Sequence, residues 1–120
     1  MLTYWSGIQE TRKPYKEGRY DLLDSWNTLL IPKVVAALLP EKETEQMCQM
    51  KQLSKWLSTS LCFTPGTLGG IKVDGTAFHH GGFYPGYTTG ALGAVGSYIG
   101  FTLDTPYQIS QTGRKVFRTA

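Results

Sequence analysis

Two successive apolar stripes at helical spacing constrain the fold of this 120-residue chain more than any other feature. Large apolar side chains form one broad stripe in residues 20–39, at Leu22, Trp26, Leu29, Leu30, Val34 and Leu38. A second stripe runs through residues 41–63, at Met47, Met50, Leu53, Trp56, Leu57 and Leu61. This period predicts two amphipathic helices, which the short link around Pro40 makes antiparallel neighbours. Trp26 and Trp56 lie on the stripes, which favours core packing over stacking on a sugar.

Proline and charge refine these two helices. Pro32 interrupts the first stripe and should kink the helix or split it in two, because proline removes a backbone donor and crowds the preceding turn. The second segment opens with Glu41, Glu43 and Glu45, a preference that suits the positive end of a helix dipole. Pro40 between the segments marks the end of the first helix.

The chain changes character between residues 64 and 86. The sequences TPGTLGG and YPG carry closely spaced turn signals without a helical period, and IKVDG leaves room for a strand of two or three residues at most. Loops of about 20 residues without secondary structure are uncommon and usually functional or disordered, and the aromatic residues here argue for order. Two further helices are predicted over residues 87–103 and 110–119. The sequence therefore predicts an all-α chain of helical hairpins joined by a long Gly- and aromatic-rich loop, residues 64–86.

The composition is that of a globular protein and argues against several functional classes. Apolar residues make up 41% and charged residues 18%, which is too apolar for a disordered chain. The net charge of +3 comes without a basic stripe, so no nucleic-acid partner is expected. Cys48 and Cys62 lack the close pairing of a zinc site and are too few for a disulfide framework. The opening sequence MLTYWSGIQETRKPYKEGRY shows no signal peptide.

Residues 87–103 have one feature of a membrane helix, because Gly96 and Gly100 show the small-xxx-small spacing of membrane helix pairs. The run is at the lower limit of length for crossing a bilayer, however, and it contains several threonines, a serine and two tyrosines. We therefore expect a close-packed helix of a soluble domain and no membrane partner.

The stretch DGTAFHHGGFYPGY, which begins at Asp74, gathers side chains that move protons. It contains His79 and His80, and histidine titrates near neutral pH. It also contains Tyr84 and Tyr87, whose phenols can act as acids. Asp74 is its only carboxylate, so a two-carboxylate glycosidase site is not supported, and it holds no serine or cysteine nucleophile.

The residues alone leave three interpretations of this stretch open. The histidines could be structural loop residues, the aromatic loop could bind sugars without chemistry, or a histidine and a tyrosine could transfer protons. A metal site is not expected, because it needs a third ligand and adjacent histidines do not easily face one ion.

Residues 70–87, GIKVDGTAFHHGGFYPGY, resemble the signature loop of polysaccharide lyase family 8, especially its chondroitin ABC lyase branch. That branch carries an IK-x-DG-T-A-aromatic-x-H-x-x-x-YPGY pattern. Downstream, residues 104–117, DTPYQISQTGRKVF, resemble the segment that follows this loop in the family. The two amphipathic helices suit the family's helical toroid. The resemblance implies that residues 1–120 are a central fragment of an incomplete α/α toroid.

The resemblance also implies roles for individual residues. It makes His80 the catalytic histidine and Tyr87 the catalytic tyrosine, because the spacing His80-x6-Tyr87 follows the chondroitin ABC lyase pattern. His79 stands where relatives in this branch often have arginine, and Gly81 stands where an acidic residue can occur. His79 and Tyr84 are accordingly predicted to bind substrate.

The reaction that the resemblance implies is β-elimination on a uronic acid within a glycosaminoglycan, namely chondroitin sulfate, dermatan sulfate or hyaluronan. A base removes the C5 proton beside the carboxylate, and an acid protonates the departing oxygen at C4, while the developing enolate is stabilised. In the family the tyrosine protonates the leaving group and can also be the base for glucuronate. The histidine is the expected base for iduronate.

Other parts of such an enzyme would lie outside this sequence. The family also uses an arginine and a glutamate further along the chain, groups before Met1 that neutralise the substrate carboxylate, and a large β-sandwich region. The resemblance therefore implies a fragment that is inactive alone, without a cofactor of its own, although it allows a divalent cation in the longer parent. It places that parent in the periplasm or outside the cell. The main alternative is a non-catalytic carbohydrate-binding or structural helical protein.

Overall fold

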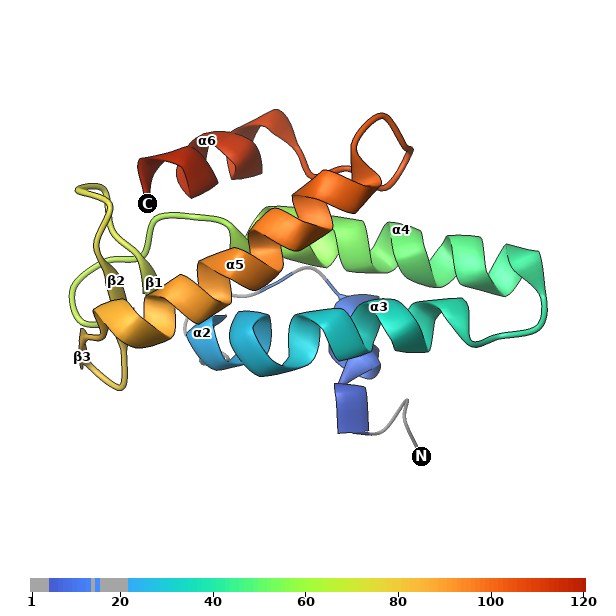
Figure 1. Ribbon diagram of the computed structural model, residues 1–120, viewed down its shortest axis with the longest axis horizontal. Coiled ribbons are helices and arrows are strands. Elements are labelled where there is room, and N and C mark those ends of the chain that lie inside the picture. The colour runs from blue at the N-terminus through green and yellow to red at the C-terminus, as the bar shows by residue number, and fades with distance from the viewer. Residues whose placement is uncertain (1–4, 14, 16–21) are drawn as a thin grey trace.

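The computed structural model describes residues 5–13, 15 and 22–120, and most of these residues are helical (Figure 1). The helical elements are η1 (Ile8–Arg12), α2 (Leu22–Asp24), η2 (Ser25–Leu29), α3 (Leu30–Leu38), α4 (Glu43–Ser60), α5 (Pro85–Thr102) and α6 (Gln111–Thr119). The strands are β1 (Gly70–Ile71), β2 (Ala77–His79) and β3 (Gly82–Phe83). The predicted all-α class is confirmed as a mostly helical chain with one small sheet.

The four predicted helices correspond to the run α2–η2–α3 and to α4, α5 and α6. Their ends differ from the predicted ones by at most three residues within the described part of the chain. Residues 20 and 21, where the first helix was predicted to begin, lie outside that part. The 3₁₀ helix η1 was not predicted, and it packs against α3 and α4.

The first helical run passes through a π-helical turn in front of Pro32. The turn, η2, ends at Leu29, and Pro32 then occupies the first turn of α3, where the missing N–H is least costly. A π turn is a common way for a helix to accommodate an interruption of its hydrogen bonding. The predicted interruption at Pro32 is therefore realised as a wide turn between α2 and α3.

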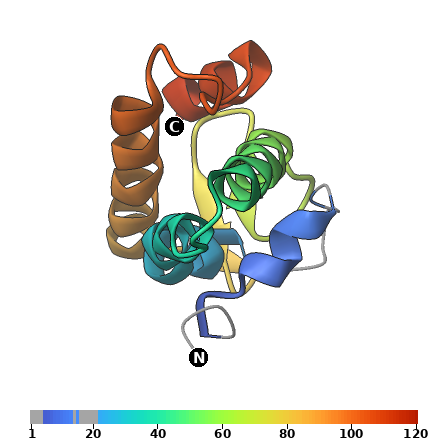
Figure 2. The same ribbon diagram turned by 90° about the vertical axis from the view of Figure 1, so that its right-hand side faces the viewer.

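α3 and α4 run side by side as the predicted antiparallel pair, and α5 packs across η2 and α3 (Figures 1 and 2). The side chain of Gln46 closes the connection between α3 and α4. Its Nε2 donates to Pro40 O at 2.7 Å and to Leu38 O at 3.1 Å. These bonds satisfy backbone acceptors that the end of a helix leaves open.

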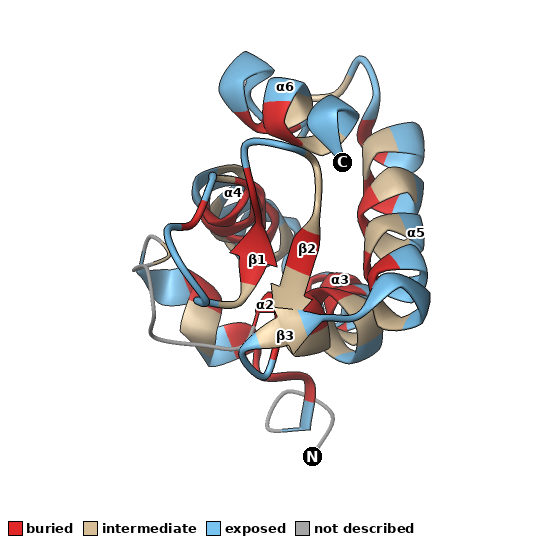
Figure 3. Ribbon diagram, turned by 90° about the vertical axis from the view of Figure 1, so that its left-hand side faces the viewer, coloured by how far each residue is buried: buried red, intermediate tan, exposed pale blue. Residues whose placement is uncertain are grey.

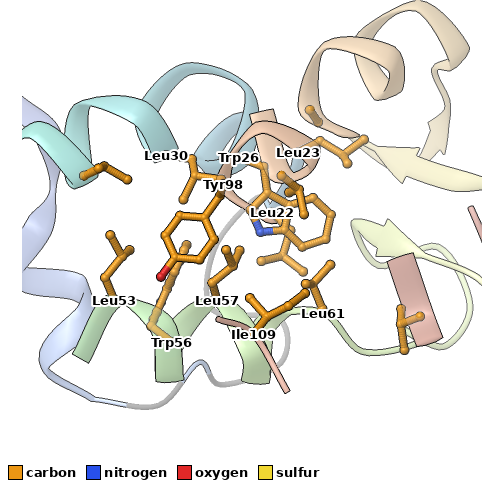
Figure 4. Packing of buried hydrophobic residues seen from close by; sticks show 14 of the residues in the cluster. Leu22, Leu23, Trp26, Leu30, Leu53, Trp56, Leu57, Leu61, Tyr98 and Ile109 are labelled. Atoms are coloured by element: carbon orange, nitrogen blue, oxygen red, sulfur yellow. The ribbon is translucent and has the colours of Figure 1, made fainter. Parts of the chain in front are cut away.

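The apolar stripes of the first two predicted helices meet α5 in one core (Figure 4). Its fully buried members include Leu22, Leu23, Trp26, Leu30, Leu53, Trp56, Leu57 and Tyr98. The indole Nε1 of Trp26 donates to Ser60 Oγ at 3.2 Å, and the hydroxyl of Tyr98 donates to Tyr107 O at 2.8 Å. Since Trp26 and Trp56 are both fully buried, the prediction that they pack in the core is confirmed.

Close packing, which was expected for α5, involves some of its glycines and not others. A Cβ at Gly90 would lie 2.5 Å from Asn27 Oδ1, so a side chain there would have to displace the Asn27 amide. Three glycines of this helix have open space around them: Gly86, Gly93 and Gly100. A Cβ at Gly96 would make an ordinary contact with the Phe117 ring, 3.6 Å away. None of the helices in the described residues combines the length and the apolar character needed to cross a membrane.

Residues 64–84 hold a small antiparallel sheet, in the order β1–β2–β3, where a loop without regular structure was predicted (Figure 3). Its register pairs Gly70 with Phe78 and His79 with Gly82. Each strand has only two or three residues, too few for an alternating pattern to show in the sequence. β1 ends at the first residue of the segment IKVDG, for which a short strand was allowed. β2 and β3 were not predicted, and they correct the expectation that the rest of residues 64–86 is an irregular loop.

Lys72, directly after β1, holds the segment before the sheet in place. Its Nζ donates to Leu68 O at 2.7 Å, to Thr64 Oγ1 at 2.9 Å, to Thr64 O at 3.1 Å and to Pro65 O at 3.3 Å. The ammonium also lies 4.9 Å from the centroid of the Phe78 ring. One side chain thus ties residues 64–68 to the sheet.

The turn between β1 and β2 rests on the end of α6. Asp74 Oδ1 accepts hydrogen bonds from Thr76 N at 2.9 Å and Thr76 Oγ1 at 2.7 Å, and the bond from the backbone is the main cause that lowers the pKa of the Asp74 carboxyl group. Gly75 has a φ of 87°, and a Cβ there would lie 2.4 Å from Thr119 O. Asp74 therefore shapes a turn that only glycine can complete.

Candidate active site

The predicted histidines and tyrosines lie where the β2–β3 turn meets the start of α5 and the end of α2 (Figure 3). His79 is the last residue of β2 and is 5% exposed, and Tyr87 lies in the first turn of α5. Their rings stack almost parallel, with centroids 4.5 Å apart and an interplanar angle of 6°. Because His79 is held by its burial, the stacking also fixes the orientation of the Tyr87 phenol.

Asp24, at the end of α2, joins this pair from a distant part of the sequence. The hydroxyl of Tyr87 donates a hydrogen bond to Asp24 Oδ1, and the same oxygen lies 4.0 Å from His79 Nε2. A hydrogen bond to a carboxylate is stronger than one between neutral groups. Asp24 therefore orients the phenol of Tyr87.

The sequence analysis missed Asp24, because its contacts span 63 residues of sequence. The available signal was its place in the segment YDLLDSW, where it interrupts an apolar run two residues before the buried Trp26. Such a position marks a carboxylate at the edge of the core, but its partner depends on how α5 and the sheet pack on α2.

His80 follows β2 in a left-handed backbone conformation, with a φ of 51°. Successive side chains of a strand point to opposite faces, but this conformation turns the His80 ring back beside that of His79. The two ring centroids lie 3.8 Å apart at an interplanar angle of 43°. His80 is exposed while His79 is buried, so His80 presents the accessible imidazole of the site.

Asp24, His79 and His80 each offer a donor atom, and these atoms all lie within 4.8 Å of one another. The sequence argument against a metal rested on the lack of a third ligand and on the difficulty of turning adjacent histidines toward one ion. In the structure Asp24 offers a third donor atom and the two imidazoles lie side by side, so neither premise holds here. The expectation that no metal binds stays a prediction. Two imidazoles and one carboxylate suit a borderline dication such as Zn²⁺, and they do not resemble the all-oxygen shell that Ca²⁺ or Mg²⁺ prefers.

Tyr84 lies at the rim of the site. Its ring meets that of His79 edge-on, with centroids 5.6 Å apart and an interplanar angle of 83°, and the residue is 48% exposed. Its carbonyl oxygen accepts hydrogen bonds from Thr88 N at 3.0 Å and Thr88 Oγ1 at 2.6 Å, which starts α5. Tyr84 has surface to offer a ligand and His79 has little, and substrate binding by these two residues stays a prediction.

The cluster has the chemistry of a proton-transfer site. The exposed imidazole of His80 can accept a proton, and the phenol of Tyr87 is oriented to donate one. Both roles depend on His79, which contacts both rings. The two residues that the sequence singled out as a pair thus lie in one cluster, and their catalytic roles stay a prediction.

Comparison with known proteins places this chain in a family. The family model described as "Lyase, catalytic" matches residues 1–120. A chondroitin sulfate ABC exolyase of Bacteroides thetaiotaomicron is 30% identical over 114 residues, which cover 95% of this chain and 11% of that relative. A chondroitin sulfate ABC exolyase of Proteus vulgaris is 27% identical over 108 residues, covering 90% of this chain and 11% of the relative.

A chondroitin sulfate ABC endolyase of Proteus vulgaris is 30% identical over 92 residues, covering 76% of this chain and 9% of that protein. The chain thus spans about a tenth of the length of the curated relatives that it matches. The resemblance to chondroitin ABC lyases that residues 70–87 indicated is confirmed. The chain belongs to the lyase family whose catalytic region this model describes.

Proposed function

We propose that this chain is part of the catalytic centre of a glycosaminoglycan lyase that cleaves chondroitin sulfate or dermatan sulfate by β-elimination. The observation that carries the proposal is the contact of Tyr87 with the Asp24 carboxylate, beside two adjacent imidazoles, one of which stacks on the Tyr87 ring. Each of the three relatives is named as a chondroitin sulfate ABC lyase, which supports the same substrate class.

In the proposed reaction on iduronate, His80 removes the C5 proton and Tyr87 gives its proton to the glycosidic oxygen that leaves C4. Glucuronate carries its C5 proton on the opposite face, and there Tyr87 is the expected base. The C5–H and C4–O bonds break, a C4=C5 double bond forms, and one proton moves onto the enzyme while another moves to the leaving oxygen. Asp24 orients the phenol, so Tyr87 is placed to serve as the acid, and the accessible imidazole of His80 is placed to serve as the base. The flanking Gly81 and Gly82 leave room for a bulky sugar chain beside His80.

The proposal places this segment within a longer lyase. There it would form the central part of an incomplete α/α toroid. An arginine and a glutamate further along that protein would position the tyrosine and the substrate carboxylate, and groups before Met1 would neutralise the charge of that carboxylate. We assign no cofactor to the reaction at this site, because the His–His–Asp donor set does not match a Ca²⁺ or Mg²⁺ site. The proposed acidic polysaccharide substrate implies a periplasmic or secreted location for the whole protein.

The test uses the longer lyase with chondroitin sulfate and dermatan sulfate, and it follows the ultraviolet absorbance of the new C4=C5 double bond. Tyr87→Phe and His80→Gln are each expected to lower kcat by about a thousandfold, the usual size of a lost general acid or base. Tyr107→Phe is the matched control. The backbone carbonyl of Tyr107 accepts a hydrogen bond from the buried Tyr98 and is unchanged in this variant, and its phenol lies outside the cluster, so activity should persist. Full activity of Tyr87→Phe or His80→Gln would show that the roles are assigned to the wrong residues.

A second candidate is carbohydrate binding without chemistry, and the exposed aromatic rim favours it. Phe83 is 56% exposed and Tyr84, which follows it in the sequence and contacts His79, is 48% exposed. Binding of chondroitin sulfate to the 120-residue chain, measured by calorimetry, separates the two candidates. If the protein only binds carbohydrate, Tyr84→Ala and Phe83→Ala should lower its affinity for chondroitin sulfate, and the longer protein should form no unsaturated product. Formation of that product by the longer protein would favour the lyase.

A further inference from the structure

We propose that Asp24, His79 and His80 form a binding site for a transition-metal dication, with Zn²⁺ as the probe. Their donor atoms all lie within 4.8 Å of one another, and they come from two elements that are distant in the sequence, α2 and the end of β2. The cluster combines two imidazole nitrogens with a carboxylate oxygen, the donor set of many three-ligand zinc sites that keep an open fourth position.

The convergence depends on the backbone of His80. Neighbouring residues in a strand point to opposite faces, so paired histidines in regular β structure cannot share an ion. The left-handed φ of 51° at His80 removes this obstacle and sets its ring 3.8 Å from that of His79. Non-glycine residues rarely adopt this conformation, because it brings Cβ close to the following carbonyl oxygen. Here it brings both imidazoles to one side.

Two of the three ligands are already held in place. His79 is buried and stacked on Tyr87, and its Nε2 lies 4.0 Å from Asp24 Oδ1. Tetrahedral Zn²⁺ with bonds of about 2.1 Å needs ligand atoms roughly 3.4 Å apart. The donors must therefore close by about an ångström, which suits the exposed His80 because it is followed by two glycines, Gly81 with a φ of 75° and then Gly82.

Metal in this site would oppose the proposed reaction. An ion bound to His80 occupies the lone pair that accepts the C5 proton, and an ion bound to Asp24 competes with the Tyr87 hydroxyl for the same carboxylate. We therefore infer that the metal is an inhibitor. This consequence rests on the proposed lyase function, whereas metal binding itself does not.

Binding is tested first on the 120-residue chain, without a histidine tag and with Cys48→Ser and Cys62→Ser, since both thiols are alternative zinc ligands. Calorimetry should show one Zn²⁺ per chain and no saturable Mg²⁺ binding. His80→Gln and Asp24→Asn should each weaken Zn²⁺ binding about tenfold or more. Asp74→Asn, which removes an exposed carboxylate from the same sheet, should leave the affinity unchanged.

A spectrum checks the coordination itself. Co²⁺ bound in place of Zn²⁺ should give the intense visible bands of a four-coordinate site, and these bands should disappear in His80→Gln. Circular dichroism confirms that this exposed-site variant is folded. The proposal is overturned if no saturable binding occurs, or if His80→Gln and Asp24→Asn bind Zn²⁺ as tightly as the parent chain.

The inhibitory step is tested in the longer lyase. Zn²⁺ should suppress product formation, a chelator should restore it, and the residual activity of Asp24→Asn should be much less sensitive to the metal. Tight binding without any loss of lyase activity would overturn the inhibition alone. An enzyme without lyase activity in the absence of metal would instead count against the proposed function and leave the calorimetric result standing.

Discussion

Two lysines are buried in the part of the chain that the structure describes, one in the helical core and one in the small sheet, and their surroundings differ. Lys33, in α3, is fully buried, and its Nζ lies 3.5 Å from Glu10 Oε2 and 5.3 Å from the centroid of the Trp56 ring. Its Nζ has no hydrogen-bond partner within the described residues. Lys72, beside β1, is 9% exposed and donates hydrogen bonds to four oxygen atoms.

The difference shows how each region is stabilised. The helical core has many fully buried apolar side chains, so it can tolerate a charge that is poorly solvated, and burial lowers the pKa of Lys33 although Glu10 partly offsets this. The sheet has strands of two or three residues and little apolar area of its own. We infer that Lys33 weakens its region while Lys72 is the main support of the region that carries the histidines.

The largest effect is expected for Lys72→Met, which keeps the aliphatic stem over Phe78 but removes the ammonium. Several backbone oxygens of residues 64–68 would lose a charged donor, and the free energy of unfolding should fall by about 3 kcal/mol. Urea denaturation measures the loss. Amide hydrogen exchange should accelerate through residues 64–83 and change little in α4.

The control for this variant is Lys55→Met, at an exposed position of α4, which should change stability by less than about 0.5 kcal/mol. If the two lysine substitutions had equal effects, Lys72 would not be the support of the sheet.

A smaller loss is expected for Gly75→Ala, which tests the contact between the sheet and α6. The added Cβ would lie 2.4 Å from Thr119 O at a position with a φ of 87°, so we expect a cost of about 2 kcal/mol. Gly66→Ala is the matched control, because Gly66 also has a positive φ, 52°, but open space around it. It should cost about 1 kcal/mol from backbone strain alone. Equal losses in urea denaturation would mean that the end of α6 yields to the methyl group without cost.

The same contrast explains what the sequence could predict. The helices could be predicted because their apolar residues repeat at helical spacing. The stripe from Met50 to Leu61 is long enough for its period to predict α4 and its buried face. The turn signals of proline and glycine and the spacing of His80 and Tyr87 likewise indicated the stretch that holds the candidate site. The sheet, by contrast, depends on single residues whose partners are far away in sequence or on one backbone angle. The contacts of Asp24 span 63 residues, and the left-handed φ of His80 is a single backbone angle, so no local sequence pattern predicts either feature.

A gain in stability is expected when the Lys33–Glu10 pair is replaced by Lys33→Met together with Glu10→Gln. Replacing a poorly solvated buried ion pair with groups of similar volume is often neutral or stabilising, and we expect about 1 kcal/mol at pH 7. Lys33→Met alone should do worse, since it leaves the Glu10 carboxylate, 26% exposed, beside an apolar chain. A loss of stability in the double variant would show that the pair supports the core.

The lowered pKa of Lys33 also predicts how the stability difference between the parent chain and the double variant changes with pH. Burial lowers the pKa of Lys33 in the folded chain, so the unfolded chain binds more protons between that lowered pKa and the ordinary lysine value of about 10.4. Stability of the parent chain relative to the double variant should therefore rise as the pH increases through this window. Urea denaturation of both proteins from pH 7 to about pH 10 measures the difference. A constant difference would contradict the lowered pKa.

The smallest effect on stability, about 0.5 kcal/mol, is expected for Asp24→Asn, at the point where the helical region meets the sheet. The amide has the same shape and can still accept the Tyr87 hydroxyl, so the fold and the stacking on His79 should persist. The negative charge is lost, however, so the charge-assisted hydrogen bond that orients the phenol becomes a weaker, neutral one. In the longer lyase kcat should therefore fall by about tenfold although the fold persists. An unchanged kcat would mean that Asp24 only supports the structure.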